Sequence, residues 1–224
     1  MRQRMNAAAL VFTLLLAAGA TAAAQEVARL SEPEGAPRQR GVYGMEHAAD
    51  EYGVWGGGSF SSPTLIGTTE RVRLGLVAFR YARVLARGEN LALKYTLDAV
   101  PVASMSFPAF EASGSGGREV RKTITGAGLS PVGFQLNFRR RERVQPFAQA
   151  SGGFLYFGER VPSASSGAQF NFTGDFGGGV QWKTGPRRAW TAGYRYHHVS
   201  NGFRADVNPG FDSNLFYVGF SIFR

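Results

Sequence analysis

The sequence predicts an all-β protein, an eight-stranded antiparallel transmembrane β-barrel, and three observations support this prediction. The chain begins with a charged and then apolar segment of the kind that directs a protein to export. From Tyr52 onward, apolar and polar residues alternate with a period of two, the pattern of strands whose two faces meet different surroundings. Short and long connections alternate between these segments, as they do in bacterial outer-membrane barrels.

A secretory signal peptide is predicted over residues 1–24. Two arginines form its positive start, and an apolar core follows over residues 7–20. Small residues at 22–24 form the cleavage site, which places the expected start of the mature chain at Gln25. The apolar core is too short to cross a bilayer as a helix. The sequence contains no cysteine that could carry a lipid anchor or form a disulfide.

The composition favours strands and an anionic membrane surface. The 224 residues include 30 Gly and 18 Phe, and no later apolar run approaches the ~18 residues of a spanning helix. The net charge of +9 suits anionic lipid headgroups or lipopolysaccharide phosphates. Nucleic acid is a poor candidate partner for an exported chain without a recognisable binding motif. No cofactor or metal is expected, because the three histidines have no clustered carboxylates around them.

The strands follow a polar lead-in. Residues 25–50 are predicted to be an irregular periplasmic segment, and the barrel is predicted over 51–224. In the segment 168–183, Phe170 and Phe172 belong to an apolar and aromatic face, while the alternate positions are polar or glycine. Eight such strands are predicted, near residues 52–60, 69–84, 90–104, 126–139, 144–158, 168–183, 189–200 and 214–223.

The connections predict how the barrel is oriented. Periplasmic turns of such barrels are short and their outer loops are long, so with both termini in the periplasm the seventh strand ends at the cell exterior. The predicted short turns are 87–90, 140–143 and 185–188, and the predicted longer loops are 61–68, 105–125, 159–167 and 201–213.

A polar lumen and an aromatic outer face explain the alternation. A soluble sandwich also alternates, but the export signal favours the barrel, whose closed sheet pairs every backbone group in lipid. On the second strand the choice of face stays open, because Leu74 and Val77 belong to two competing apolar sets. We expect an interior polar network that includes Lys94, Asp98, Gln135, Asn137, Asp175, Lys183 and Arg195.

A candidate catalytic group lies at the end of the seventh strand. His198 and Ser200 are two residues apart, so on a strand they share one face, and this face carries aromatic residues expected to meet lipid. Asp212 is in phase with the lipid-facing residues of the last strand. A hydroxyl, an imidazole and a carboxylate there could act as nucleophile, base and orienting acid on an ester that lies in the membrane. The candidate donors to an oxyanion are Asn201, Asn208 and backbone N–H groups around Gly202.

These residues resemble a known family. The segment from His198 to Asn201, followed by Asn208 to Asp212 and a final strand, is similar to the C-terminal signature of the outer-membrane lipid A 3-O-deacylases (PagL type, also known as acyloxyacyl hydrolases). The resemblance implies an eight-stranded barrel in the bacterial outer membrane. It also implies hydrolysis of the 3-position acyl ester of lipid A (lipopolysaccharide) by the His-x-Ser pair and an acid twelve residues after the serine. That acid is typically Glu in the family and is Asp212 here, while Asn208 matches an Asn by the oxyanion site.

Other interpretations of the same residues stay open. Asp206 is a second candidate for the orienting acid, and His197 points to the opposite face, where it would line the lumen. A non-catalytic structural or adhesion barrel and an esterase that acts on phospholipid are the alternative functions. The basic residues of the predicted outer loop could be solvated or could contact lipid A phosphates; they are Arg118, Arg121 and Lys122.

Overall fold

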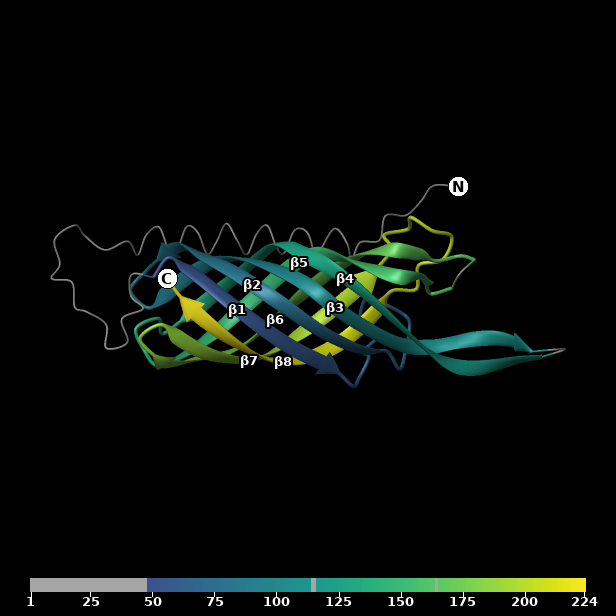
Figure 1. The fold of residues 1–224 in the computed structure, drawn as a ribbon, viewed down its shortest axis with the longest axis horizontal. Helices are drawn as coiled ribbons and strands as arrows, with labels where there is room; N and C mark the ends of the chain where they lie inside the picture. The colour runs from purple at the N-terminus through teal and green to yellow at the C-terminus, as the bar shows by residue number, and fades with distance from the viewer. Residues whose placement is uncertain (1–47, 114–115, 164) are drawn as a thin grey trace.

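The computed structural model describes residues 48–113, 116–163 and 165–224. These residues form eight antiparallel strands, each paired with the next, and β1 pairs with β8 to close the barrel (Figure 1). The predicted signal peptide and nearly all of the predicted lead-in lie outside the described residues. The strands are β1 (Asp50–Ser59), β2 (Arg73–Arg87), β3 (Leu91–Ser113), β4 (Gly116–Phe138), β5 (Val144–Val161), β6 (Ala168–Gly185), β7 (Arg188–Ser200) and β8 (Phe211–Phe223).

The predicted fold class is confirmed, but one predicted loop is wrong. The segment 105–125 is a hairpin, because β3 and β4 stay paired from Ser104 opposite Thr125 to Ser113 opposite Gly116. Its β-branched residues favour strand, and the glycine-rich stretch predicted as loop lies only at the tip. Since β4 pairs with β5 only from Gly126 onward, the outer part of this hairpin projects beyond the barrel (Figure 1).

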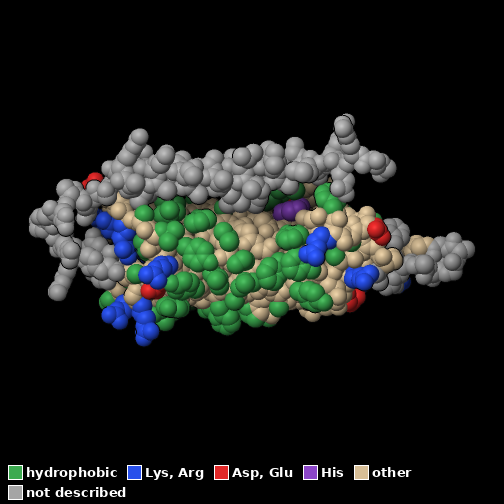
Figure 2. All heavy atoms as spheres, turned by 90° about the horizontal axis from the view of Figure 1, so that it is seen from above, with side chains coloured by type: hydrophobic (Ala, Val, Ile, Leu, Met, Phe, Trp, Pro, Cys, Tyr) green, Lys and Arg blue, Asp and Glu red, His purple; other side chains and the backbone are tan. Residues whose placement is uncertain are grey.

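The outer surface of the barrel is an apolar belt. On the face shown in Figure 2, hydrophobic side chains gather over the middle of the barrel, and Lys and Arg side chains lie towards its two ends. On β2, Val77 and Phe79 are exposed while Leu74 and Leu76 point inward, which settles the competing faces of that strand. Aromatic rings of adjacent strands pair across this belt, as between Trp190 and Phe220, whose centroids lie 5.3 Å apart. Within the described residues, no helix is long and apolar enough to cross a bilayer.

The half of the lumen nearest the C-terminus is polar, as the sequence predicts. Both carboxylate oxygens of Asp98 accept hydrogen bonds from the Arg80 guanidinium, each at 2.7 Å, and Arg195 lies 3.4 Å from the same carboxylate. Lys94 Nζ donates to Glu51 Oε2 at 2.7 Å. The predicted interior residues Gln135, Asn137, Asp175 and Lys183 are also buried there.

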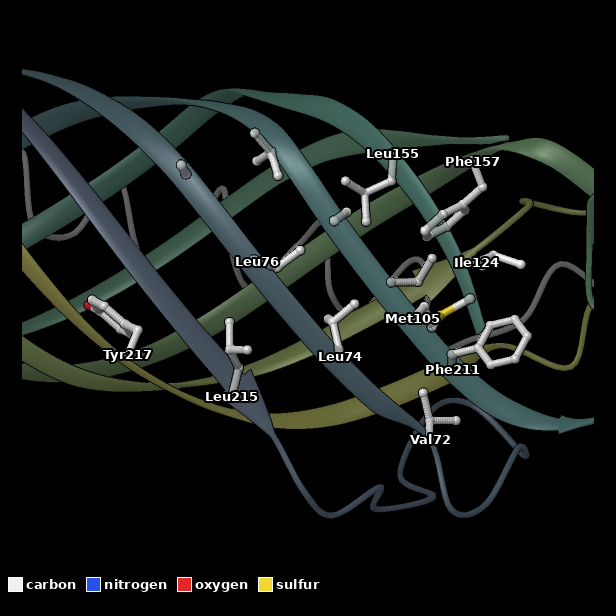
Figure 3. Packing of buried hydrophobic residues seen from close by; sticks show 14 of the residues in the cluster. Val72, Leu74, Leu76, Met105, Ile124, Leu155, Phe157, Phe211, Leu215 and Tyr217 are labelled. Atoms are coloured by element: carbon white, nitrogen blue, oxygen red, sulfur yellow. The ribbon is translucent and has the colours of Figure 1, made fainter. Parts of the chain in front are cut away.

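The half of the lumen towards the longer loops is apolar, which corrects the prediction of a wholly polar interior. Inward-facing side chains of β2, β3, β4, β5 and β8 pack together across the barrel (Figure 3). The rings of Phe107 and Phe211 lie 5.4 Å apart at this end. This packing fills the outer half of the lumen and supports the first residues of β8. Its members include Val72, Leu74, Leu76, Met105, Ile124, Leu155, Phe157 and Leu215.

We expect Asp98→Asn to destabilise the barrel strongly. The change leaves two buried guanidinium groups, those of Arg80 and Arg195, with one carboxylate fewer, which costs about 3 kcal/mol of the free energy of unfolding. Urea unfolding of the barrel in lipid vesicles measures this. The control is Asp206→Asn, an exposed carboxylate, for which we expect a change within about 0.5 kcal/mol. Equal stability of the two variants would contradict the prediction.

Candidate active site

The site lies where β7 and β8 pair at the loop end of the barrel. His198 and Asp212 stand directly opposite each other in the register of these strands. His198 Nδ1 lies 2.6 Å from Asp212 Oδ1, within hydrogen-bond distance. The Asp212 side chain is fully buried and the His198 side chain is 17% exposed. Since one nitrogen of the imidazole faces the carboxylate, the other nitrogen is left for a further partner.

Ser200 ends β7 on the same face as His198. Its partner in β6 is Phe172, whose side chain is 45% exposed on the apolar belt. The Ser200 hydroxyl makes no hydrogen bond to any residue that the structure describes. In substrate-free enzymes, the hydrogen bond between a nucleophile and its base is often long and tightens when substrate binds. Ser200 and His198 therefore share one outward-facing patch at the rim of the belt, and the carboxylate of Asp212 is buried beside His198.

The β1–β2 loop (residues 60–72) holds the carboxylate of Asp212. The backbone N–H groups of Ile66 and Gly67 donate to Asp212 Oδ2 at 2.9 and 2.8 Å. The Ser62 hydroxyl donates to the backbone oxygen of Asp212 at 2.9 Å. Hydrogen bonds from backbone amides stabilise an ionised carboxylate, so this loop keeps the acid charged and aimed at His198. Sequence reasoning missed Ile66 and Gly67, because backbone donors leave no side-chain signal.

The β7–β8 loop (residues 201–210) packs on the β1–β2 loop. Thr68 N donates to Pro209 O at 2.7 Å, and Thr69 N donates to Gly210 O at 3.3 Å. Gly210 has φ +68°, and a Cβ atom there would lie 2.9 Å from Cε1 of His198 and 3.0 Å from Cα of Gly67. A glycine is therefore needed where both loops meet the imidazole.

The predicted oxyanion donors differ in which of their N–H groups already make hydrogen bonds. The Asn201 side chain is occupied in the loop: its Nδ2 donates to Val207 O at 2.8 Å, and its Oδ1 accepts from Phe203 N at 2.9 Å. Asn208 Oδ1 accepts from Asn201 N at 3.0 Å, and its Nδ2 makes no hydrogen bond with the described part of the chain. Gly202, at φ +63°, turns the backbone beside the ring of Phe172. Asn208 Nδ2 and the Gly202 N–H are thus the donors best able to meet an anion.

The other predicted residues lie elsewhere. Asp206 is exposed and makes no ion pair or hydrogen bond with the described residues, so Asp212 is the acid that lies beside His198. His197 is buried in the lumen, as predicted, with Nδ1 3.6 Å from Oδ2 of Asp175. Among the described residues, no three potential metal-binding side chains form a group, and His47 lies outside that part of the chain.

A groove opens on the apolar belt and crosses β6, β7 and β8, with Gly56 of β1 also lining it. It has a volume of about 600 Å³ and exists because small residues, among them Gly178 and Ala192, face outward between aromatic rings. Tyr194 marks its near end, four residues before His198, or about 13 Å at the rise of a strand. The far wall is formed by Phe216 and Val218 of β8. An extended apolar chain that lies along β7 from Ser200 could reach this groove.

The chain is similar to a family of outer-membrane enzymes and to solved outer-membrane barrels. A family model described as "Lipid A 3-O-deacylase (PagL)" matches residues 90–221. Among solved structures, the outer membrane enzyme PagL is similar, with 17% identity, a TM-score of 0.46, and coverage of 76% of this chain and 98% of that chain. OprG from Pseudomonas aeruginosa is similar with 11% identity, a TM-score of 0.46, and coverage of 80% of this chain and 97% of that chain. Neisserial surface protein A is similar with 14% identity, a TM-score of 0.42, and coverage of 77% of this chain and 96% of that chain. No curated protein matches the chain.

We expect Gly210→Ala to loosen the contact between the two loops. A side chain at this positive φ is strained by about 1–2 kcal/mol, and the added Cβ would collide with His198 and Gly67. Trypsin should then cleave the folded barrel faster after Arg71, which lies in the β1–β2 loop. The control is Gly185→Ala, where an added Cβ meets nothing within 4 Å. Unchanged cleavage in Gly210→Ala would show that the loops do not depend on this glycine.

Proposed function

Because the matched residues 90–221 make up more than half of its 224 residues, the chain belongs to the lipid A 3-O-deacylase (PagL) family, and we propose that it hydrolyses the 3-position acyl ester of lipid A with Ser200 as nucleophile. Membership of this family makes the chain an outer-membrane deacylase of lipid A. The position of the ester and the identity of the catalytic residues are the proposed part.

One observation supports the catalytic assignment above all. The imidazole of His198 and the carboxylate of Asp212 lie 2.6 Å apart, and Ser200 stands two residues further on the same outward face. In the proposed first step, His198 Nε2 takes the proton of Ser200 Oγ as the oxygen attacks the ester carbonyl. Asp212 holds the Nδ1–H tautomer and stabilises the imidazolium that forms. His198 then returns the proton to the departing alcohol oxygen of the sugar.

An acyl group remains on Ser200 after this step. His198 next takes a proton from water, the water oxygen attacks the acyl carbonyl, and the fatty acid leaves as Ser200 regains its proton. Each tetrahedral intermediate carries a negative oxygen. The Nδ2 group of Asn208 and the backbone N–H of Gly202 are the proposed donors to it, because both lie in the loop that follows Ser200 and neither donates to another of the described residues.

The side chain of Asp212, one methylene shorter than the family's usual glutamate, is long enough to reach His198 across the two strands. Residues directly opposite in an antiparallel pair have Cβ atoms about 4.5–5.5 Å apart, which one short carboxylate arm can bridge. Asp212 is directly opposite His198, and its second oxygen is held by the N–H groups of Ile66 and Gly67. Aspartate can therefore serve where the family typically has glutamate.

The outward position of the candidate active site supports the proposal that the substrate is embedded in the membrane. Ser200 is flanked by the apolar belt at Phe172, and the groove beside Tyr194 lies within the belt, about 13 Å along β7 from His198. A lipid whose ester is at the headgroup boundary can present its carbonyl to Ser200 while its acyl chain lies in the groove. The substrate then need not leave the outer leaflet.

We expect Ser200→Ala and Asp212→Asn each to lower the rate of deacylation at least about a thousandfold, as losses of a nucleophile or an orienting acid do elsewhere. The assay is mass spectrometry of lipid A from cells that express each variant. The matched control for the acid is Asp206→Asn, six residues earlier and in the β7–β8 loop, which should keep its activity. An unchanged lipid A profile with Ser200→Ala would refute the proposed nucleophile. Phospholipid with similar acyl chains, offered in place of lipid A, tests the alternative esterase.

The groove gives a separate expectation about chain length. Ala192→Phe fills the groove, so the variant should lose activity on long acyl chains by about tenfold and keep its activity on a short-chain ester. The readout is the ratio of rates on the two substrates in detergent micelles. Ala150→Phe, on the lipid-facing side of β5, is the control and should leave the ratio unchanged. A parallel loss on both substrates would mean that the groove does not receive the acyl chain.

A further inference from the structure

We propose that the barrel carries a second lipid site, separate from the candidate active site, in which Arg73 and Arg121 bind the phosphate monoester of a lipid in the outer leaflet. The site lies on the outer face of β2, β3 and β4, at the end of the barrel from which the β3–β4 hairpin projects (Figure 1). It does not depend on the hydrolysis proposed for Ser200.

A row of polar side chains builds this site across three strands. Arg73 of β2 is directly opposite Ser106 of β3, and Ser106 is directly opposite Thr123 of β4. Arg121 lies two residues from Thr123 and therefore on the same face. This face is outward, because the alternate residues in the same strands are buried in the lumen; they are Leu74, Met105, Phe107 and Ile124. Two guanidinium groups and two hydroxyl groups thus converge on one exposed patch.

The position of Arg121 is fixed without using all of its donors. Its Nη2 donates to the backbone oxygens of Arg71 and Ser106, at 3.0 and 3.2 Å. These contacts fold the guanidinium back towards Arg73, and its Nε and Nη1 make no hydrogen bond with the described residues. A phosphate oxygen could accept from both of these nitrogens, the paired geometry for which arginine is suited.

The positive charge of the patch is only partly balanced. Arg71 pairs with Glu119 at 2.8 Å, and this hydrogen bond raises the pKa of Arg71. Arg73 has no carboxylate partner among the described residues. Burial, and after it the charges of Arg73 and Arg71, lowers the pKa of Arg121, which lies beyond the part of β4 that pairs with β5. An anion placed between Arg73 and Arg121 would relieve this repulsion.

The location favours a lipid phosphate over a free ion. Val77, two outward positions along β2 from Arg73, is 41% exposed on the apolar belt. Arg73 and Arg121 therefore stand just outside the belt, at the level where headgroups meet water. The patch is open to solvent, so a free phosphate ion keeps most of its hydration. A lipid in the same leaflet is already held beside the patch at a high local concentration.

Native mass spectrometry of the purified barrel tests the site. The Ser200→Ala background prevents hydrolysis of any bound lipid, so failure of the proposed catalysis does not affect the result. Phosphatidic acid, with a bare phosphate monoester, is compared with phosphatidylcholine of the same acyl chains. We expect Arg73→Gln with Arg121→Gln to weaken phosphatidic acid binding about tenfold. The control pair, Arg118→Gln with Arg160→Gln, removes the same charge from the same end of the barrel and should change binding less than about twofold.

Three results would overturn the proposal. The first is equal binding of phosphatidic acid by the two double variants, provided that both keep the heat-dependent gel mobility of a folded barrel. The second is equal binding of phosphatidic acid and phosphatidylcholine by the parent protein. The third is displacement of phosphatidic acid by an equal concentration of inorganic phosphate, which would mean that the patch takes a free ion and not a lipid.

Discussion

Closure of the sheet is the constraint on which the rest of the molecule depends. Pairing of β1 with β8 leaves no open edge, and it fixes the register of every strand relative to its neighbours. In that register His198 stands opposite Asp212, so one backbone arrangement satisfies the hydrogen bonds of the sheet and also sets the distance between the proposed base and the proposed acid. A slip of one residue would turn one of the two side chains into the lumen.

The two halves of the lumen support this arrangement in different ways. Towards the C-terminus, charged groups are buried in pairs, and contacts such as that of Arg195 with Asp98 join β7 to β3 across the lumen. Towards the longer loops, Phe107 and Phe211 belong to an apolar core that packs against the inner side of β8. The outward-facing Asp212 follows directly after Phe211, so the site rests on a packed interior.

The sequence predicted the strands and the positions of His198, Ser200 and Asp212, because both follow from alternation with a period of two. It did not predict that β3 and β4 extend to Ser113 and Gly116, since glycine and serine are common to loops and to hairpins that continue in water. The support of Asp212 by the β1–β2 loop was also missed. That support is made by backbone N–H groups across about 145 residues of sequence separation, and no local pattern encodes it. The apolar outer lumen was missed because a residue facing a packed interior and one facing lipid can be equally hydrophobic.

The packed outer lumen limits the routes by which water and fatty acid can reach and leave the candidate active site. Met105, Phe157 and Leu215 fill the lumen behind β8, so the packed interior offers no path through the barrel wall to the site. The water that the proposed hydrolysis consumes must therefore arrive from the extracellular medium across the rim. The liberated fatty acid must leave laterally into the same leaflet that held the lipid substrate. Water and fatty acid therefore both move along the outside of the barrel and not through its lumen.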